Sequence, residues 1–241
     1  MILAVKPNKS DKTHSSAKLI WLGAIALGIA YLAPSLGRSG VMFESLTAIP
    51  KPIIVAWKGV FTLSLAASVY LLGKNFAARL IASSLLISAI ADMLLVTVGM
   101  VASGLGFALA HSLALVAYRK TQLRRISRVR AILAIAFPIL VTVGTCALLS
   151  FSNQPWALGL FVLLSSSMAA TALLSRFPPW LSGAGAVIFT LSDVLFFADL
   201  ALFDGMARLG WLTWICFATG YALVARGAIQ FIAAQQMADH L

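Results

Sequence analysis

Residues 131–175 contain no charged side chain, and this run constrains the fold more than any other feature of the sequence. A soluble protein would have to bury the whole run, whereas a lipid bilayer accepts it, because a membrane-spanning helix needs about 20 mostly apolar residues. The rest of the chain is similar: 61% of its 241 residues are hydrophobic, 10% are charged and the mean hydropathy is +0.98. Soluble domains carry about 25% charged residues. The sequence therefore predicts an integral membrane protein.

Apolar runs separated by turn signals predict an all-α, polytopic fold with about eight transmembrane helices. The glycine-rich stretch "GMVASGLG" separates the third run from the fourth, and "RFPPW" separates the sixth from the seventh. The predicted spans are 19–36, 52–72, 77–97, 101–118, 131–150, 156–174, 180–202 and 211–232. The expected regions are a basic cytoplasmic tail at 1–18, a single transmembrane domain at 19–232 and a short C-terminal tail at 233–241.

Positive charge gathers on one side of the predicted membrane domain. With eight spans, both termini and alternate loops share a side, and that side holds all of the eighteen Lys and Arg residues except Arg38, Lys51, Lys58 and Arg208. The positive-inside rule then predicts that both termini are cytoplasmic, most simply in a bacterial inner membrane. The net charge of +11 has this topological explanation, and we expect no nucleic-acid partner, because no basic domain interleaved with aromatic residues is present. Contact with lipid headgroups is a second interpretation of the basic loop at 119–130.

Ionisable side chains lie inside several predicted spans, although a charge at that depth costs roughly 2.5–3.5 kcal/mol on insertion scales. Asp92 and Asp193 each lie about 20 Å from the cytoplasmic start of their helix, at a rise of about 1.5 Å per residue. By the same rise, His111 lies roughly 15 Å below the outer face, and Lys58 lies about 10 Å deeper than Lys51. Four helices therefore bring polar groups to the outer half of the bilayer, which predicts a site there.

Other polar residues have simpler interpretations. A single buried aspartate or histidine can hydrogen-bond a neighbouring helix, and Lys51 at a helix end can extend to the interface. Asp199 is expected to be solvated, and Ser165, Ser166 and Ser167 are expected to be packing residues, because no G-x-S-x-G elbow is present. The two cysteines lie in apolar runs without CxxC or Cys/His spacing, so neither a metal nor a cofactor is expected.

Five motifs follow one another along the chain: "IPKPIIVAWKG" at 49–59, "LLISAIADMLL" at 85–95, "GLGFALAHSLALVAY" at 104–118, "GAGAVIFTLSDVLFF" at 183–197 and "CFATGYALVARG" at 216–227. Together they resemble the YhhN-like lysoplasmalogenase family over roughly residues 50–230. The family pattern has a Lys-Pro at the second helix, a Gly-Asp before a leucine pair, an F-x-x-x-H-x-x-x-Y-like helix and a Gly-Ala…Ser-Asp helix. Ala91 stands where the pattern has Gly, and Tyr221 stands where many members have Gln or His.

The resemblance implies hydrolysis of the vinyl-ether bond of lysoplasmalogens, which gives a fatty aldehyde and a glycerophospho-base. A vinyl ether is protonated on its β-carbon, and water then traps the oxocarbenium ion; glycosidases handle such ions with two carboxyl groups in different protonation states. Asp92 and Asp193 fit these two roles in either order, and His111 would hydrogen-bond a carboxylate or water. The side chains expected to bind the lysophospholipid are Lys51, which would hold the phosphate as a point charge, Lys58, Tyr118 and Tyr221.

Two other functions are compatible with aspartates inside membrane helices. An intramembrane aspartyl protease also uses two of them, but its Tyr-Asp, Gly-x-Gly-Asp and Pro-Ala-Leu patterns are missing from this sequence. A transporter or lipid-binding protein without catalysis can use buried Asp, Lys and His as a proton relay. That alternative predicts helices broken at mid-depth and access for water from both sides.

Overall fold

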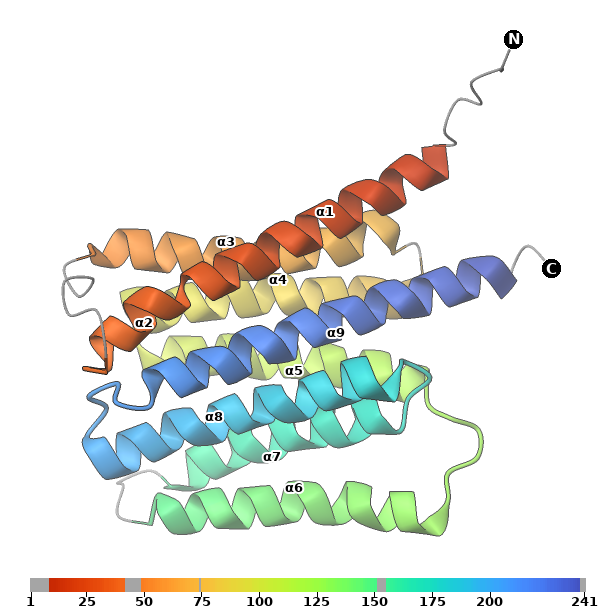
Figure 1. Ribbon diagram of the computed structural model, residues 1–241. Helices are drawn as coiled ribbons and strands as arrows, with labels where there is room; N and C mark the ends of the chain where they lie inside the picture. The colour runs from red at the N-terminus through yellow and green to blue at the C-terminus, as the bar shows by residue number, and fades with distance from the viewer. Residues whose placement is uncertain (1–8, 42–48, 74, 151–154, 239–241) are drawn as a thin grey trace.

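The computed structural model describes residues 9–41, 49–73, 75–150 and 155–238, which form a bundle of helices (Figure 1). The helices are α1 (Lys9–Ala30), α2 (Leu32–Arg38), α3 (Lys51–Leu72), α4 (Phe76–Thr97), α5 (Met100–Lys120), α6 (Arg128–Leu148), α7 (Pro155–Leu173), the π-helical turn η2 (Pro179–Gly183), α8 (Ala184–Phe203) and α9 (Gly210–Ala238). No β-strand occurs among the described residues. Within them, seven spans are long and apolar enough to cross a membrane, and Leu158–Leu173 of α7 forms a shorter apolar helix. The predicted all-α, polytopic membrane fold is confirmed.

The first and last helices extend beyond the predicted spans. α1 begins at Lys9, inside the predicted tail, and α9 continues to Ala238. A break separates α1 from α2, because Pro34 has no N–H with which to continue the hydrogen-bond ladder of α1. Residues 1–8 and 239–241 of the two predicted tails lie outside the described residues.

α1 begins and α9 ends at the same end of the bundle (Figure 1). We call this the basic end, because the loop that joins α5 to α6, within the basic stretch 119–130, lies there. Backbone hydrogen bonds from Leu123 N to Leu174 O (3.0 Å) and from Arg176 N to Thr121 O (2.8 Å) hold this loop against the connection between α7 and α8. A start of α1 and an end of α9 at the same end of the bundle agree with an even number of membrane crossings. The cytoplasmic location of this end stays a prediction.

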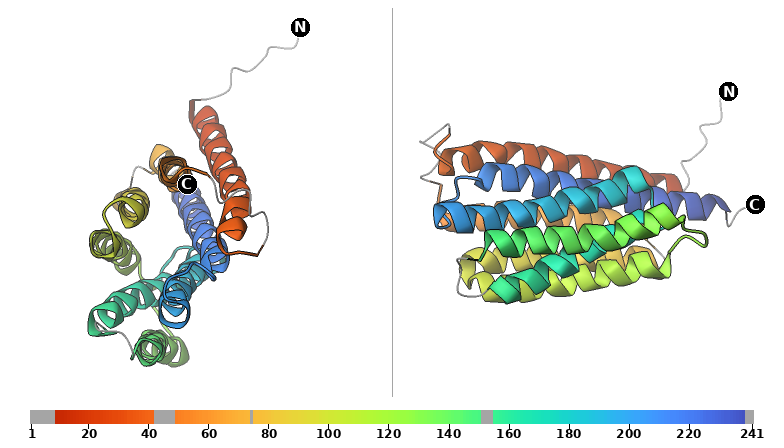
Figure 2. Two further views of the ribbon diagram at one scale, coloured as in Figure 1. Left: turned by 90° about the vertical axis from the view of Figure 1, so that its left-hand side faces the viewer. Right: turned by 90° about the horizontal axis from the view of Figure 1, so that it is seen from below.

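Six of the helices close into a ring. Each contacts the next in the order α3, α4, α5, α7, α8 and α9, and α9 returns to α3. The end-on view in Figure 2 shows this arrangement, with α1 and α2 outside the ring against α3 and α9. α6 also lies outside, against α7 and, less extensively, α8. Side chains from six separate segments can therefore meet inside the ring.

The tightest seam of the ring joins α8 to α9. A Cβ added to Gly185 would lie 2.7 Å from the Gly220 carbonyl oxygen, and a Cβ added to Gly220 would lie 2.8 Å from the Gly185 carbonyl oxygen. Small residues allow such a close approach of two membrane helices. As a result, Phe189 of α8 stacks on Tyr221 of α9, with ring centroids 4.3 Å apart.

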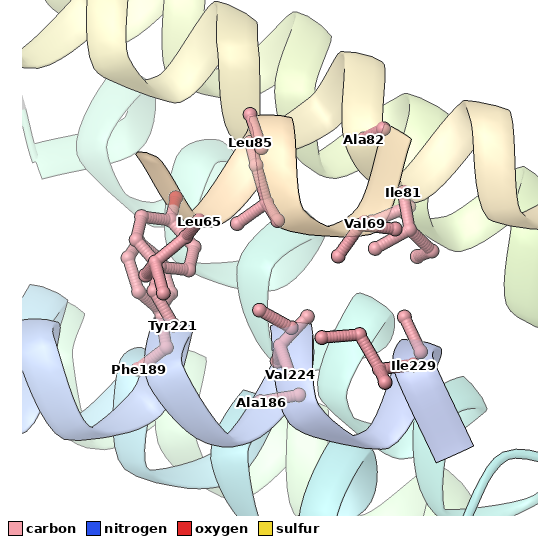
Figure 3. Packing of buried hydrophobic residues seen from close by; sticks show 14 of the residues in the cluster. Leu65, Val69, Ile81, Ala82, Leu85, Ala186, Phe189, Tyr221, Val224 and Ile229 are labelled. Carbon is pink, nitrogen blue, oxygen red and sulfur yellow. The ribbon is translucent and has the colours of Figure 1, made fainter. Parts of the chain in front are cut away.

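Aliphatic side chains pack together in the half of the ring interior nearer the basic end. Figure 3 shows Leu65 and Val69 of α3 and Leu85 of α4 above Val224 and Ile229 of α9, and all five are buried. A dense layer of this kind leaves little room for water. Polar groups in the other half of the ring are therefore separated from the basic end.

The two helices that carry the buried aspartates are continuous. α4 runs without interruption through Asp92, and α8 runs without interruption through Asp193. The transporter interpretation predicts breaks at this depth, and neither helix has one.

Candidate functional site

The first polar centre of the ring is an ion pair between α3 and α4. Lys58 Nζ lies 2.6 Å from Asp92 Oδ1, and the two side chains are 17% and 4% exposed. The ammonium also lies 5.8 Å from the ring centroid of Trp214 and 5.9 Å from that of Phe217, both on α9. In a buried ion pair, each charge compensates the cost of taking the other out of water. Removing either residue therefore leaves an uncompensated charge. The ammonium of Lys58, a residue predicted to bind the substrate, is paired with Asp92.

The second polar centre lies on the α5, α7 and α8 side of the ring. Ser165 Oγ donates a hydrogen bond of 2.6 Å to Asp193 Oδ2, and Ser165 Oγ also lies 3.3 Å from Thr190 Oγ1. His111 Nε2 lies 4.0 Å from Asp193 Oδ2, while the imidazole is 2% exposed. The Asp193 side chain is 14% exposed. Hydroxyl and imidazole groups thus surround this carboxyl, in contrast to the lysine beside Asp92.

Aromatic rings occupy the space between the two centres. Phe217 lies near Lys58 and has its ring centroid 5.7 Å from that of Phe189, and Phe189 meets the His111 ring edge-on at 5.2 Å. The Tyr221 hydroxyl donates a hydrogen bond of 2.7 Å to Ser88 Oγ on α4. The two carboxyl groups therefore face one aromatic-lined interior from different helices.

This layer takes one polar side chain from each helix of the ring: Lys58, Asp92, His111, Ser165, Asp193 and Tyr221. Two of its atoms, Asp92 Oδ2 and His111 Nε2, are buried and have no hydrogen-bond partner in the described part of the chain. Buried polar atoms in native structures nearly always have a hydrogen-bond partner, so these two atoms are exceptions. Both atoms therefore remain available for a hydrogen bond in this layer.

The structure places the other two predicted site residues outside this layer. Lys51 is the first residue of α3, exposed at the end of the bundle opposite the basic end. Tyr118 lies seven residues after His111, about 10 Å further toward the basic end at the helical rise. Its ring packs edge-on against Phe177 at 5.2 Å, and its hydroxyl lies near Ser182. The structure does not bring Tyr118 into the polar layer.

Two other sequence interpretations are corrected by the structure. Asp199 is 6% exposed rather than solvated, because its two carboxylate oxygens accept hydrogen bonds from the Ala207 and Leu209 backbone N–H groups at 2.9 and 2.7 Å. Ser165 is more than a packing residue, because it hydrogen-bonds Asp193. The depth of the two residues in the membrane could have indicated this pair. Ser165 follows the start of α7 by as many residues as Asp193 precedes the end of α8, so the two lie at a similar depth.

Two shallow grooves lie outside the ring. The groove between α3 and α4 has a volume of about 350 Å³ and is lined by Lys51, Pro52, Val55, Ala56, Met93, Val96 and Thr97. The groove between α6 and α8 has a volume of about 360 Å³ and is lined by Phe137, Leu140, Val141, Gly144, Thr145, Val187, Thr190, Leu191 and Val194. The first carries a cation at one end, and the second is lined by uncharged side chains.

The chain matches the model of the YhhN family over residues 53–228. The chain belongs to the YhhN family. The match covers α3 from its third residue, the whole remainder of the ring as far as residue 228 of α9, and α6. All six residues of the polar layer therefore lie within the YhhN region, whereas Lys51, α1 and α2 precede it.

No curated protein and no solved structure gives a significant match to the chain. Among the described residues, no three His, Cys, Asp or Glu side chains are close enough together to hold a metal ion.

Proposed function

We propose that this protein hydrolyses the vinyl-ether bond of lysoplasmalogens to a fatty aldehyde and a glycerophospho-base. Membership of the YhhN family supports a lysoplasmalogenase-type role. The observation that carries the proposal is the pair of carboxyl groups inside one ring with different partners: a lysine beside Asp92, and a serine and a histidine beside Asp193. Reactions through an oxocarbenium ion use two carboxyl groups in different protonation states.

The partners of the carboxyl groups support one order of the two roles. Asp193 supplies the proton, because a carboxyl group buried among neutral partners avoids the cost of an uncompensated charge in its protonated form. Asp92 supplies the carboxylate, because the Lys58 ammonium at 2.6 Å balances its negative charge. The sequence left these roles open.

The proposed reaction begins when Asp193 donates its proton to the β-carbon of the vinyl ether, which leaves an oxocarbenium ion and an Asp193 carboxylate. Asp92 stabilises the cation and accepts a proton from the water that adds to the α-carbon, giving a hemiacetal. Asp193 then takes the hemiacetal hydroxyl proton while Asp92 returns its proton to the glycerol oxygen. The carbon–oxygen bond breaks, aldehyde and alcohol form, and both carboxyl groups regain their starting states.

The remaining polar groups orient the reactants in this proposal. His111 Nε2, which lacks a hydrogen-bond partner among the described residues and lies 4.0 Å from Asp193 Oδ2, orients the Asp193 carboxyl. Tyr221 lines the space between the carboxyl groups. Lys51 holds the phosphate near the membrane surface. The basic end faces the cytoplasm of a bacterial cell, as the loop charges favour.

The test compares Asp92→Asn and Asp193→Asn with Asp204→Asn in purified protein supplied with an alkenyl lysophospholipid. Each site variant should lose about 100-fold or more of aldehyde release, the usual contribution of a positioned acid or base. Asp204 is an exposed residue at the end of α8 in a left-handed conformation with φ 52°, which Asn also tolerates, so its variant should keep full activity. An alkyl lysophospholipid should release no aldehyde, because it has no double bond to protonate. Full activity in both site variants would refute the proposal.

A further inference from the structure

The groove between α3 and α4 has the features of a site for a lipid with one hydrocarbon chain and an anionic head. Its one charged lining residue is Lys51, and the other lining residues are apolar apart from Thr97. Lys51 begins α3 and Thr97 ends α4, so the charge lies at the end of the bundle opposite the basic end. No acidic side chain lines the groove or lies within ion-pair distance of Lys51 in the described residues.

The opposite end of the groove adjoins the first polar centre. Met93, which follows Asp92 in sequence, lines the groove, and a Cβ added to Gly59 would lie 2.8 Å from Met93 Sδ. Gly59 in turn follows Lys58. The Met93 side chain therefore closes the seam between α3 and α4 at the level of the Lys58–Asp92 pair. A methionine side chain is flexible enough to change its position when a ligand fills the groove.

The length of the groove suits a lysolipid. On α3 the groove lining runs from Lys51 to Ala56, which is about 7.5 Å at the helical rise. In a lysoplasmalogen, one glycerol unit separates the phosphate from the vinyl ether. A phosphate beside Lys51 would therefore bring the ether toward the level of Met93 and Asp92.

We propose that the α3–α4 groove binds a single-chain lysophospholipid, with its phosphate at Lys51 and its chain directed toward Met93. The choice of a lysolipid, and with it the single chain, rests on the proposed function, whereas the anionic head follows from Lys51, the one charged lining residue. The α6–α8 groove has a similar volume but no charged lining residue, so it offers no means of selecting an anionic head.

The test uses a 1-O-alkyl lysophospholipid with a photoreactive group on its chain, because this probe cannot be hydrolysed as a vinyl ether. We expect cross-links on α3 and α4. Ala56→Leu, which fills the groove, should weaken labelling about tenfold or more, equivalent to about 1.4 kcal/mol. Ala67→Leu makes the same change at an exposed position on the same helix outside the groove and should label normally.

The head of the probe is tested separately. Lys51→Gln should weaken labelling, and Lys51→Arg should restore it, because the guanidinium keeps the positive charge. Arg208→Gln removes an exposed charge at the same end of the bundle and should have no effect. Labelling confined to the α6–α8 groove, or labelling unchanged by Ala56→Leu and Lys51→Gln, would overturn the inference. Normal labelling of α3 and α4 without aldehyde release from the alkenyl lipid would support the groove and refute only the proposed hydrolysis.

Discussion

The most informative stability experiment replaces Lys58 by Met, which keeps the length of the apolar stem and removes the charge. The Asp92 side chain is 4% exposed, its Oδ2 already lacks a partner among the described residues, and its Oδ1 would lose the 2.6 Å contact with Lys58. Removing one member of a buried ion pair costs about 3–5 kcal/mol. Because the Lys58 side chain is 17% exposed and so only partly desolvated, we expect the lower end, about 3 kcal/mol.

The matching variant is Asp92→Leu, which leaves the ammonium without its carboxylate. We expect a smaller loss of about 2 kcal/mol, because the Trp214 and Phe217 rings still lie near the cation. The double variant Lys58→Met/Asp92→Leu should lose about 1 kcal/mol, less than either single change, because an apolar pair leaves no buried charge.

The assay is unfolding by sodium dodecyl sulfate in mixed micelles, followed by circular dichroism, for the wild type and the three variants. Lys18→Met, at an exposed position of α1, is the control and should change the free energy of unfolding by less than about 0.5 kcal/mol. If the double variant loses the sum of the two single losses, the pair has no coupling energy and the reasoning is refuted.

Three further predictions concern the fold and the groove. Asp199→Ala should reduce the free energy of unfolding by about 2–3 kcal/mol, because two backbone N–H groups lose a charged acceptor; an unchanged unfolding curve would contradict this assignment. Gly220→Ala should cost about 1–3 kcal/mol, because the new Cβ meets the backbone of α8, whereas Gly104→Ala meets open space and should be nearly neutral in the same unfolding assay. Gly59→Ala should reduce labelling of the α3–α4 groove, because it displaces Met93 into the groove; adding Met93→Ala should restore the labelling, and failure of this rescue would argue against Met93 as the inner wall.

The sequence was sufficient to predict an all-α membrane protein and the approximate spans, because both follow from local physical requirements. A bilayer demands runs of apolar residues and a backbone hydrogen-bonded within each segment, and neither demand depends on which helices are neighbours. The same reasoning identified Asp92, Asp193 and His111 as polar residues within the bundle, since a polar residue inside an apolar run is visible in the sequence; Asp92 and His111 are buried, and Asp193 is 14% exposed.

The tertiary structure alone decided which polar side chains contact one another. Three contacts depend on the order and rotation of the helices in the ring. Lys58 pairs with Asp92, Ser165 rather than its neighbours hydrogen-bonds Asp193, and Asp199 accepts hydrogen bonds from the loop after α8. The order and rotation of the helices follow from close contacts between segments distant in sequence, such as the contact of α8 with α9 at Gly185 and Gly220. A helix forms from its own residues, but the direction in which each of its faces points is set by the neighbours that pack against it.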